Sequence, residues 1–185
     1  MQATVPTDVT ELAEACVDYV RRALGVTLDY TGDTLSVLDH YLNEARRVDR
    51  PEAQEIVARA AAAYFGEVLR RRFECWWHDG GDDVGSYELR FGPVYLSVQP
   101  YALVATALGL GTDEERDLAG IVIDEDEVEI IGAHLAALPP VTEEEFAKLT
   151  TRFDVLEIVV DQLKARADAR GQGDVFFEDA DYMSS

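Results

Sequence analysis

Residues 60–77 read AAAAYFGEVLRRRFECWW, and this stretch decides the fold. Its first part continues a helical pattern that begins after Pro51, and proline is well accepted in the first turn of a helix. We therefore predict a long helix over about Glu52–Arg72. The residues expected on its buried side are Ile56, Val57, Ala60, Ala63, Tyr64 and Leu69.

A glycine lies well inside this predicted helix. Gly66 costs about 1 kcal/mol of helix stability relative to alanine. A glycine is tolerated at such a position where another element approaches the backbone closely, so we expect a close contact there.

The pattern after the helix changes to the period of two that is typical of strands. Cys75–Trp77 predicts a first strand, and a polar loop follows over Asp79–Ser86. Tyr87–Phe91 and Val94–Val98 alternate apolar and polar residues, and Gly92-Pro93 between them predicts a tight hairpin. We expect a three-stranded antiparallel meander with one face against the helices.

Apolar residues at helical spacing predict further helices on both sides of this meander. They cover Asp8–Leu24, Asp33–Arg47, Pro100–Leu108, Val128–Leu138 and Glu143–Arg170. Thr112 with Glu115, and Thr142 with Glu145, have the spacing of a capping box. The predicted fold class is α+β and predominantly helical, with helices packed on a small sheet and a long C-terminal helix.

The last predicted helix carries an apolar stripe at alternating spacings of three and four residues. Its members are Phe146, Leu149, Phe153, Leu156, Val160, Leu163 and Ala167. The flanking charges are mostly acidic, and two parallel copies would repel each other, so we expect the stripe to pack within the chain. A homodimer formed through this helix is the alternative.

The predicted organisation is one domain over residues 1–170. It comprises a body over 1–110 and an acidic helical extension over 111–170. We expect residues 171–185 to form a flexible acidic tail, although four apolar residues offer it a way to dock on the body. These are Val175, Phe176, Phe177 and Tyr182.

Charge is distributed unevenly along the chain, whose net charge is −21. Residues 1–77 hold 13 acids and 9 arginines, and residues 78–185 hold 24 acids and 7 Lys or Arg. This excess argues against binding of nucleic acid or of an anionic membrane. It favours either a solvated surface or a docking surface for a basic partner. Two distant cysteines and a first segment without a basic region predict a cytoplasmic protein without a secretory signal.

Several short motifs together resemble a known group of proteins. They are Leu28-Asp29-Tyr30, Thr34-Leu35, Leu38-Asp39, the run Ala63–Arg71 (AYFGEVLRR), and a nearby tryptophan. This pattern, over about Val26–Leu108, resembles a broad group of bacterial domains of unknown function. The resemblance implies an accessory or immunity-type role, since some relatives look like proteins encoded beside toxins.

Three residues are candidates for a catalytic site. Glu67, in an apolar helix near two tryptophans, is either an acid with a raised pKa or a structural acceptor. Asp29 and His78 are its possible companions in space. Asp39 is a further carboxylate, which instead caps a backbone or meets Arg46 or Arg47.

Metal and cofactor sites are not expected. Cys75-x-x-His78 supplies two ligands where zinc needs three or four, even if His40 and Glu44 approach from one helix face. The loop Asp79–Asp83 and the run Asp124–Glu127 do not match an EF-hand. The sequence also lacks phosphate-binding glycine motifs and any motif that places a catalytic nucleophile.

The function predicted from the sequence is a non-enzymatic protein-binding or accessory module, of immunity or inhibitor type. Its acidic surface would meet a protein partner of basic character, because opposite charges speed association. The alternative is an enzyme whose site is assembled from Glu67, Asp29 and His78.

Overall fold

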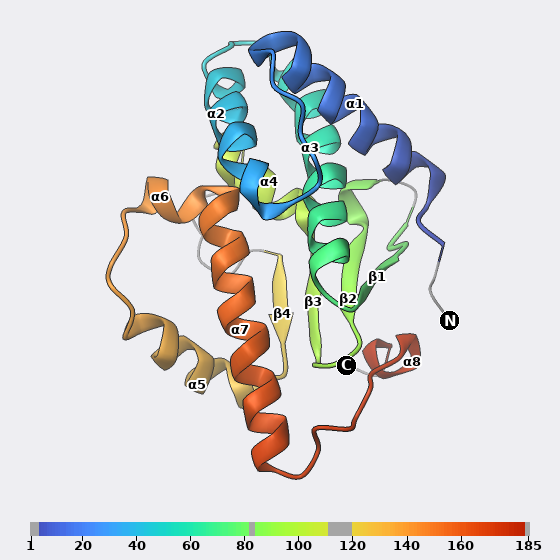
Figure 1. Cartoon of the computed structure of the whole chain (residues 1–185), viewed down its shortest axis with the longest axis vertical. Helices are drawn as coiled ribbons and strands as arrows, with labels where there is room; N and C mark the ends of the chain where they lie inside the picture. Colours follow the sequence, from blue (N-terminus) through green and yellow to red (C-terminus); the bar gives the residue numbers. More distant parts are fainter. Residues whose placement is uncertain (1–3, 82–83, 111–119, 184–185) are drawn as a thin grey trace.

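A long buried helix forms the centre of the molecule. The computed structural model describes residues 4–81, 84–110 and 120–183. In it, α3 (Pro51–Arg72) packs chiefly against α1 (Thr7–Leu24) and α4 (Pro100–Leu108) (Figure 1). Every residue from Ala60 to Leu69 is buried. Ile56, which was expected in the core, is 55% exposed, because it lies before this covered stretch.

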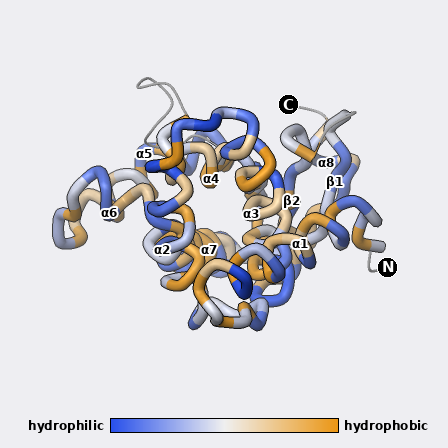
Figure 2. Tube along the Cα trace, turned by 90° about the horizontal axis from the view of Figure 1, so that it is seen from above, coloured by the Kyte–Doolittle hydropathy of each residue, from blue (hydrophilic) through white to orange (hydrophobic). Residues whose placement is uncertain are grey.

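Two further helices complete the helical layer. α2 (Leu35–Arg46) packs against both α4 and α7 (Leu149–Ala169). Figure 2 shows hydrophobic stretches of α3 and α7 in the middle of this layer, with hydrophilic stretches around it. The layer buries one face of α1, α2 and α7, as the periodicity predicted, whereas the middle of α3 is buried on all sides.

The sheet has four strands, and the expectation of three was wrong. β1 (Cys75–His78), β2 (Glu88–Phe91), β3 (Leu96–Val98) and β4 (Ile121–Ile123) form an antiparallel meander in that order. The first three strands and the antiparallel pairing are confirmed, but β3 begins at Leu96 and not at Val94, so residues 92–95 connect β2 to β3 in place of a two-residue turn. β4 was missed because three consecutive apolar residues show no alternation, and their strand conformation depends on pairing with β3.

The sheet meets the central helix at Gly66. A β-carbon placed on Gly66 would lie 2.1 Å from Cη2 of Trp77 and 3.2 Å from Cγ of Pro100. The indole ring of β1 therefore lies directly on the helix backbone. This contact confirms the close approach that the glycine predicted.

The C-terminal helix is interrupted, whereas the sequence predicted a single helix. α6 (Glu143–Ala147) ends at Lys148, whose backbone is extended (ψ 142°), and α7 begins at the next residue. The carboxylate of Asp39 accepts the N–H groups of Leu149 (2.7 Å) and Thr150 (3.1 Å) and the hydroxyl of Thr150 (2.8 Å). Asp39, on α2, thus caps α7 from 110 residues away in sequence, and this long-range cap stabilises the break.

The apolar stripe of α7 is covered within the chain. Leu149, Leu156, Val160 and Leu163 are buried against neighbouring helices. Thr142 accepts the N–H of Glu145, as its capping position predicted (3.1 Å). The second predicted capping pair, Thr112 with Glu115, lies outside the described residues.

The remaining elements pack on α7 and on the sheet. α5 (Glu125–Ala136) is joined to α7 by Ile131, which is buried, and by Glu127, which forms ion pairs with Arg166 and Arg170. After α7 the chain turns back and ends in α8 (Asp179–Tyr182) beside the sheet (Figure 1).

The packing at Gly66 leads to a first prediction. Gly66→Ala should destabilise the protein by about 1–3 kcal/mol through overpacking against Trp77, although alanine favours a helix. Chemical denaturation of both proteins measures the difference in the free energy of unfolding.

Gly132 is the matched control, because it also lies inside a helix but a β-carbon there would meet nothing within 4 Å. Gly132→Ala should leave stability unchanged or raise it by up to about 1 kcal/mol. Equal effects at the two glycines would show that the Trp77 contact does not govern the choice of glycine.

Candidate functional site

Glu67 lies at the buried junction between α3 and the sheet. Its carboxylate accepts two hydrogen bonds from Arg70, at 2.8 Å from Nε and 2.9 Å from Nη2. The indole N–H of Trp77 donates a third, at 2.9 Å. Arg71 lies 4.0 Å away on the other side. The carboxylate is therefore fully engaged with groups of the same chain.

These contacts keep Glu67 ionised. Burial alone would raise its pKa, but the hydrogen bonds from Arg70 and Trp77 and the two nearby arginine charges outweigh it, so the pKa lies below the usual value. A general acid that works near neutral pH needs a raised pKa instead. Of the two interpretations of Glu67 drawn from the sequence, the structural acceptor matches this geometry.

Asp29 shapes a turn before α2. It accepts hydrogen bonds from the backbone and hydroxyl of Thr31 (2.9 and 2.6 Å) and from the hydroxyl of Thr34 (2.9 Å). The side-chain and backbone hydrogen bonds of Thr31 lower the pKa of this exposed carboxyl. Next to it Tyr30 has a positive φ of 63°, and its N–H donates to the Tyr64 hydroxyl of α3 (2.9 Å).

His78 lies on the opposite face of the sheet from Glu67. Successive residues of a strand point to opposite faces, so Trp77 points to α3 while Trp76 and His78 point outward. His78 Nδ1 lies 3.5 Å from the carboxylate of Asp179 in α8. In the described ranges no hydrogen bond or ion pair connects Glu67, Asp29 and His78, and the sheet separates the first from the last.

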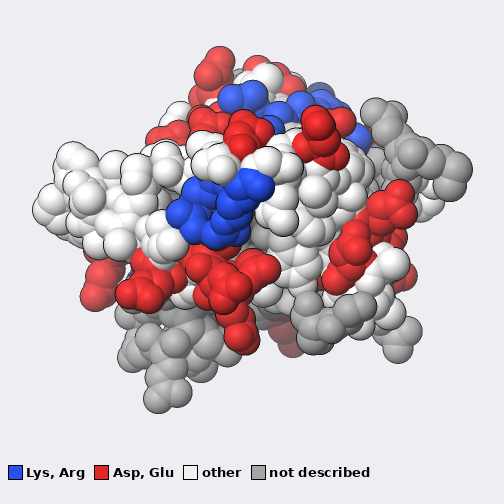
Figure 3. All heavy atoms as spheres, turned by 90° about the horizontal axis from the view of Figure 1, so that it is seen from below, with Lys and Arg blue, Asp and Glu red and all other residues white. Residues whose placement is uncertain are grey.

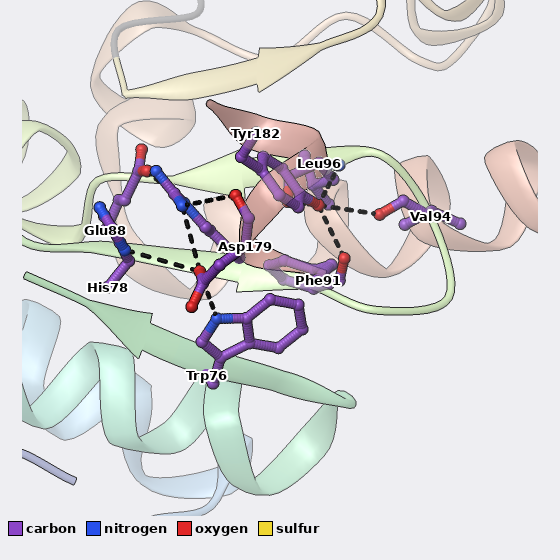
Figure 4. Close-up of polar contacts among 9 residues, drawn as sticks. Trp76, His78, Glu88, Phe91, Val94, Leu96, Asp179 and Tyr182 are labelled. Carbon is purple, nitrogen blue, oxygen red and sulfur yellow. Dashed lines mark hydrogen bonds and ion pairs between the residues drawn. The ribbon is translucent and has the colours of Figure 1, made fainter. Parts of the chain in front are cut away.

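The outer face of the sheet holds a cluster that the sequence analysis did not identify (Figure 4). Arg90 lies at its centre, only 5% exposed. Its guanidinium contacts Glu88 at 2.7 Å and Asp179 at 3.1 Å. Trp76 donates to the same Asp179 oxygen at 2.9 Å. The one available signal was the alternation in β2, which places Glu88 and Arg90 on the face opposite Leu89.

Metal ligands do not gather in the described part of the chain. Within those residues no three His, Cys, Asp or Glu side chains lie close enough to hold an ion. His40 is exposed, and Glu44 is paired with Arg47 (2.7 Å). Burial raises the pKa of the Cys75 thiol, which keeps it protonated and a poor ligand.

One small hollow lies between α2, α4 and α6. It encloses about 50 Å³ and is lined by Asp39, Leu42, Asn43, Arg46, Ala107, Glu144, Ala147 and Lys148. About 10–15 Å³ of such space holds one water molecule, whereas ligand pockets enclose about 300–1,000 Å³. This hollow therefore has room for solvent and not for an organic substrate.

A larger surface feature lies on residues 121–147, from β4 to the end of α6. Here several aliphatic side chains are exposed on β4, on α5 and on the link between α5 and α6. They are Val122, Val128, Ile130, Leu138 and Val141. Residues 121–147 contain eight acids and no lysine or arginine. We call residues 121–147 the acidic lobe.

A scan against protein-family models, a search of the curated proteins and a search of the solved structures found no match to this chain. The resemblance to bacterial accessory domains therefore stays a prediction. Within the described ranges, no helix combines the length and the apolar character needed to cross a bilayer.

The Glu67 cluster leads to a second prediction. Glu67→Gln should destabilise the protein by about 1–3 kcal/mol at pH 7, because a charged acceptor of three hydrogen bonds is lost. The folded pKa is below the ordinary value of 4.5, so this contribution is complete above that pH and disappears as the pH falls through the folded pKa. Denaturation of both proteins between pH 7 and pH 3 should show their stabilities converging in acid.

Glu44→Gln is the control, because Glu44 forms a solvent-exposed ion pair with Arg47, one helical turn away. It should cost less than about 0.5 kcal/mol at any pH. A Glu67→Gln deficit that stays constant into acid would contradict an ionised Glu67.

Proposed function

We propose that this protein is a non-enzymatic protein-binding module and that the acidic lobe is its binding surface. The observation that carries the proposal is a group of exposed aliphatic side chains in a segment of eight acids without a cation. A partner of matching chemistry has a basic surface around an apolar centre.

The apolar centre of the lobe comes from α5 and from the link to α6. Val128, Ile130 and Val141 are 44%, 45% and 53% exposed. In Figure 3 an uncharged projection extends on the side where Figure 1 places α5 and α6. Exposed apolar groups bordered by polar residues are typical of protein interfaces.

The acidic rim is largely unused by the fold. Glu127 is paired with α7, and Glu145 is paired with Lys148. Glu125, Glu129, Glu143 and Glu144 are solvent-exposed or border the hollow, and none has an ion pair within the described part of the chain. Their charge is therefore available to attract a basic partner and to speed its association.

The surroundings of the candidate catalytic residues also favour binding over catalysis. Glu67 is held by three hydrogen bonds, Asp29 holds a turn, and His78 faces Asp179 across the outer sheet face. An immunity-type inhibitor of a basic enzyme is one member of the class that such a surface fits. This role is consistent with the family resemblance, but the proposal rests on the exposed aliphatic side chains and the exposed acids of the lobe.

The experiment compares matched variants of the full chain as bait in a native cell extract. Val128→Ser with Ile130→Ser removes the apolar centre, and Val26→Ser with Val48→Ser changes two equally exposed valines elsewhere. We expect a basic protein to be captured by the wild type and by the second variant. The first variant should bind that protein, once purified, at least about tenfold more weakly, because central apolar contacts carry most interface energy.

Salt and charge variants test the rim. Glu125→Gln with Glu129→Gln should slow association at low salt, and the difference should shrink as salt screens the charges. Glu11→Gln with Glu14→Gln, on the exposed side of α1, is the charge-matched control. Equal binding by lobe and control variants, or an acidic partner, would contradict the proposal.

A further inference from the structure

The C-terminal segment lies on the outer face of the sheet as a bound peptide would. The N–H of Phe177 donates to the carbonyl of Gly92 at 2.8 Å. The Phe176 ring occupies the space above Gly92, where a β-carbon would lie 2.0 Å from Cζ. Asp179 and Tyr182 follow in α8, one helical turn apart, and both point to the sheet (Figure 4).

The first subsite holds a carboxylate. Asp179 Oδ1 accepts from the indole N–H of Trp76 (2.9 Å) and from Arg90 Nη1 (3.1 Å), and His78 Nδ1 lies at 3.5 Å. Arg90 also donates to the backbone carbonyl of Asp179 (3.4 Å). Because Glu88 holds Arg90 from the sheet itself, this subsite is built by β1 and β2 and does not need the tail to orient it.

The second subsite holds a phenol. The Tyr182 hydroxyl lies 2.7 Å from the carbonyl oxygen of Phe91, 3.2 Å from that of Val94 and 3.1 Å from that of Leu96. It also accepts the N–H of Leu96 (3.2 Å). Burial raises the pKa of Tyr182 to about 12, so the group is a neutral donor. Three carbonyl oxygens around one hydroxyl would repel a phosphate, and the subsite therefore selects unmodified tyrosine.

An aromatic ring and a guanidinium border the second subsite. The ring of Tyr95 stacks on Tyr182 with centroids 4.7 Å apart, and the Arg90 guanidinium lies 5.2 Å above the same ring. The tail nevertheless lies in a shallow site, since the side chain of Asp179 is 59% exposed and Phe176 is 54% exposed. A shallow site whose contacting groups are already in place allows the tail to exchange with a competing segment.

We propose that the outer face of β1, β2 and β3 is a peptide-binding site for the motif Asp-x-x-Tyr. The chain's own residues 179–182 occupy it, and the exchanging ligand is a segment of a partner protein with the same carboxylate and unphosphorylated phenol. The site does not rest on the proposed function of the acidic lobe: it is built from β1, β2 and β3, outside residues 121–147, and the guanidinium of Arg90 takes an acidic aromatic ligand.

Tethering determines when such exchange occurs. A segment on a short flexible link has an effective concentration of about 1 mM, so a free peptide with the same contacts competes poorly with the tail. A partner segment prevails when it binds more tightly or when the tail is weakened. A weakened tail therefore exposes the site for measurement in the full chain.

The test measures binding of a fluorescent peptide of residues 174–183 (DVFFEDADYM) by anisotropy. The receptor is the full chain with Asp179→Ala and Tyr182→Ala, which vacate both subsites. The matched control is the full chain with Asp174→Ala and Met183→Ala, which removes an acid and a large exposed side chain of the same segment. Circular dichroism of each protein confirms that the fold is retained.

We expect the Asp179→Ala, Tyr182→Ala chain to bind the peptide at least about tenfold more tightly than the wild type or the control, because its tail no longer competes. A peptide with phosphotyrosine in place of Tyr182 should lose this binding. Equal affinity for all three proteins, no saturable binding, or undiminished binding of the phosphopeptide would overturn the proposal.

A second copy of the chain is the other source of the motif, and sedimentation distinguishes it. We expect the wild type to remain a monomer as its concentration rises. A concentration-dependent dimer that the substitutions at Asp179 and Tyr182 abolish would assign the site to exchanged tails, and the separate partner would be ruled out.

Discussion

The hydrogen bond from the Trp77 indole to the Glu67 carboxylate ties the sheet to the central helix. It forms only because Gly66 lets the indole ring lie on the helix backbone, and because Arg70 supplies the charge that keeps a buried carboxylate ionised. A buried acid without such partners would be costly. The orientation of β1 follows from this junction. With β1 fixed, Trp77 faces the core while Trp76 and His78 face outward, and the outer sheet face acquires its chemistry.

The motifs that suggested a bacterial domain group acquire a physical explanation from the same junction. The Tyr64 hydroxyl of α3 accepts the backbone N–H of Tyr30, whose φ is positive, and Asp29 holds the turn around it. The Arg71 guanidinium lies 3.9 Å above the Tyr30 ring, so the helix that carries Glu67 also supports the turn before α2. Asp39, another residue of the pattern, caps α7. These polar residues therefore position elements of the fold relative to one another.

Two surfaces of different chemistry follow from this arrangement. The acidic lobe exposes aliphatic side chains among carboxylates, whereas the outer sheet face centres on Arg90, one of few cations in the second half of the chain. Glu88 of β2 and Asp179 of the tail both contact its guanidinium, so the cation is paired within the sheet and also covered by the tail. In a chain of net charge −21, the tail thus places an acidic segment over Arg90. The two surfaces have different complementary ligands because attraction between opposite charges acts locally.

The sequence by itself determined the elements whose signals are local: the long helix with Gly66, the reversal of the chain between β2 and β3, the Thr142 cap and the acidic second half. Periodicity, caps and charge counts depend on near neighbours in the chain, so one sequence suffices to read them. Only the tertiary structure decided which distant groups meet. The pairing of β4 with β3, the Asp39 cap that divides the C-terminal helix, and the contact of Asp179 with Arg90 each join segments far apart in sequence. Glu67 and His78 were separated for the same reason, since the face on which a strand residue lies depends on how the strand docks.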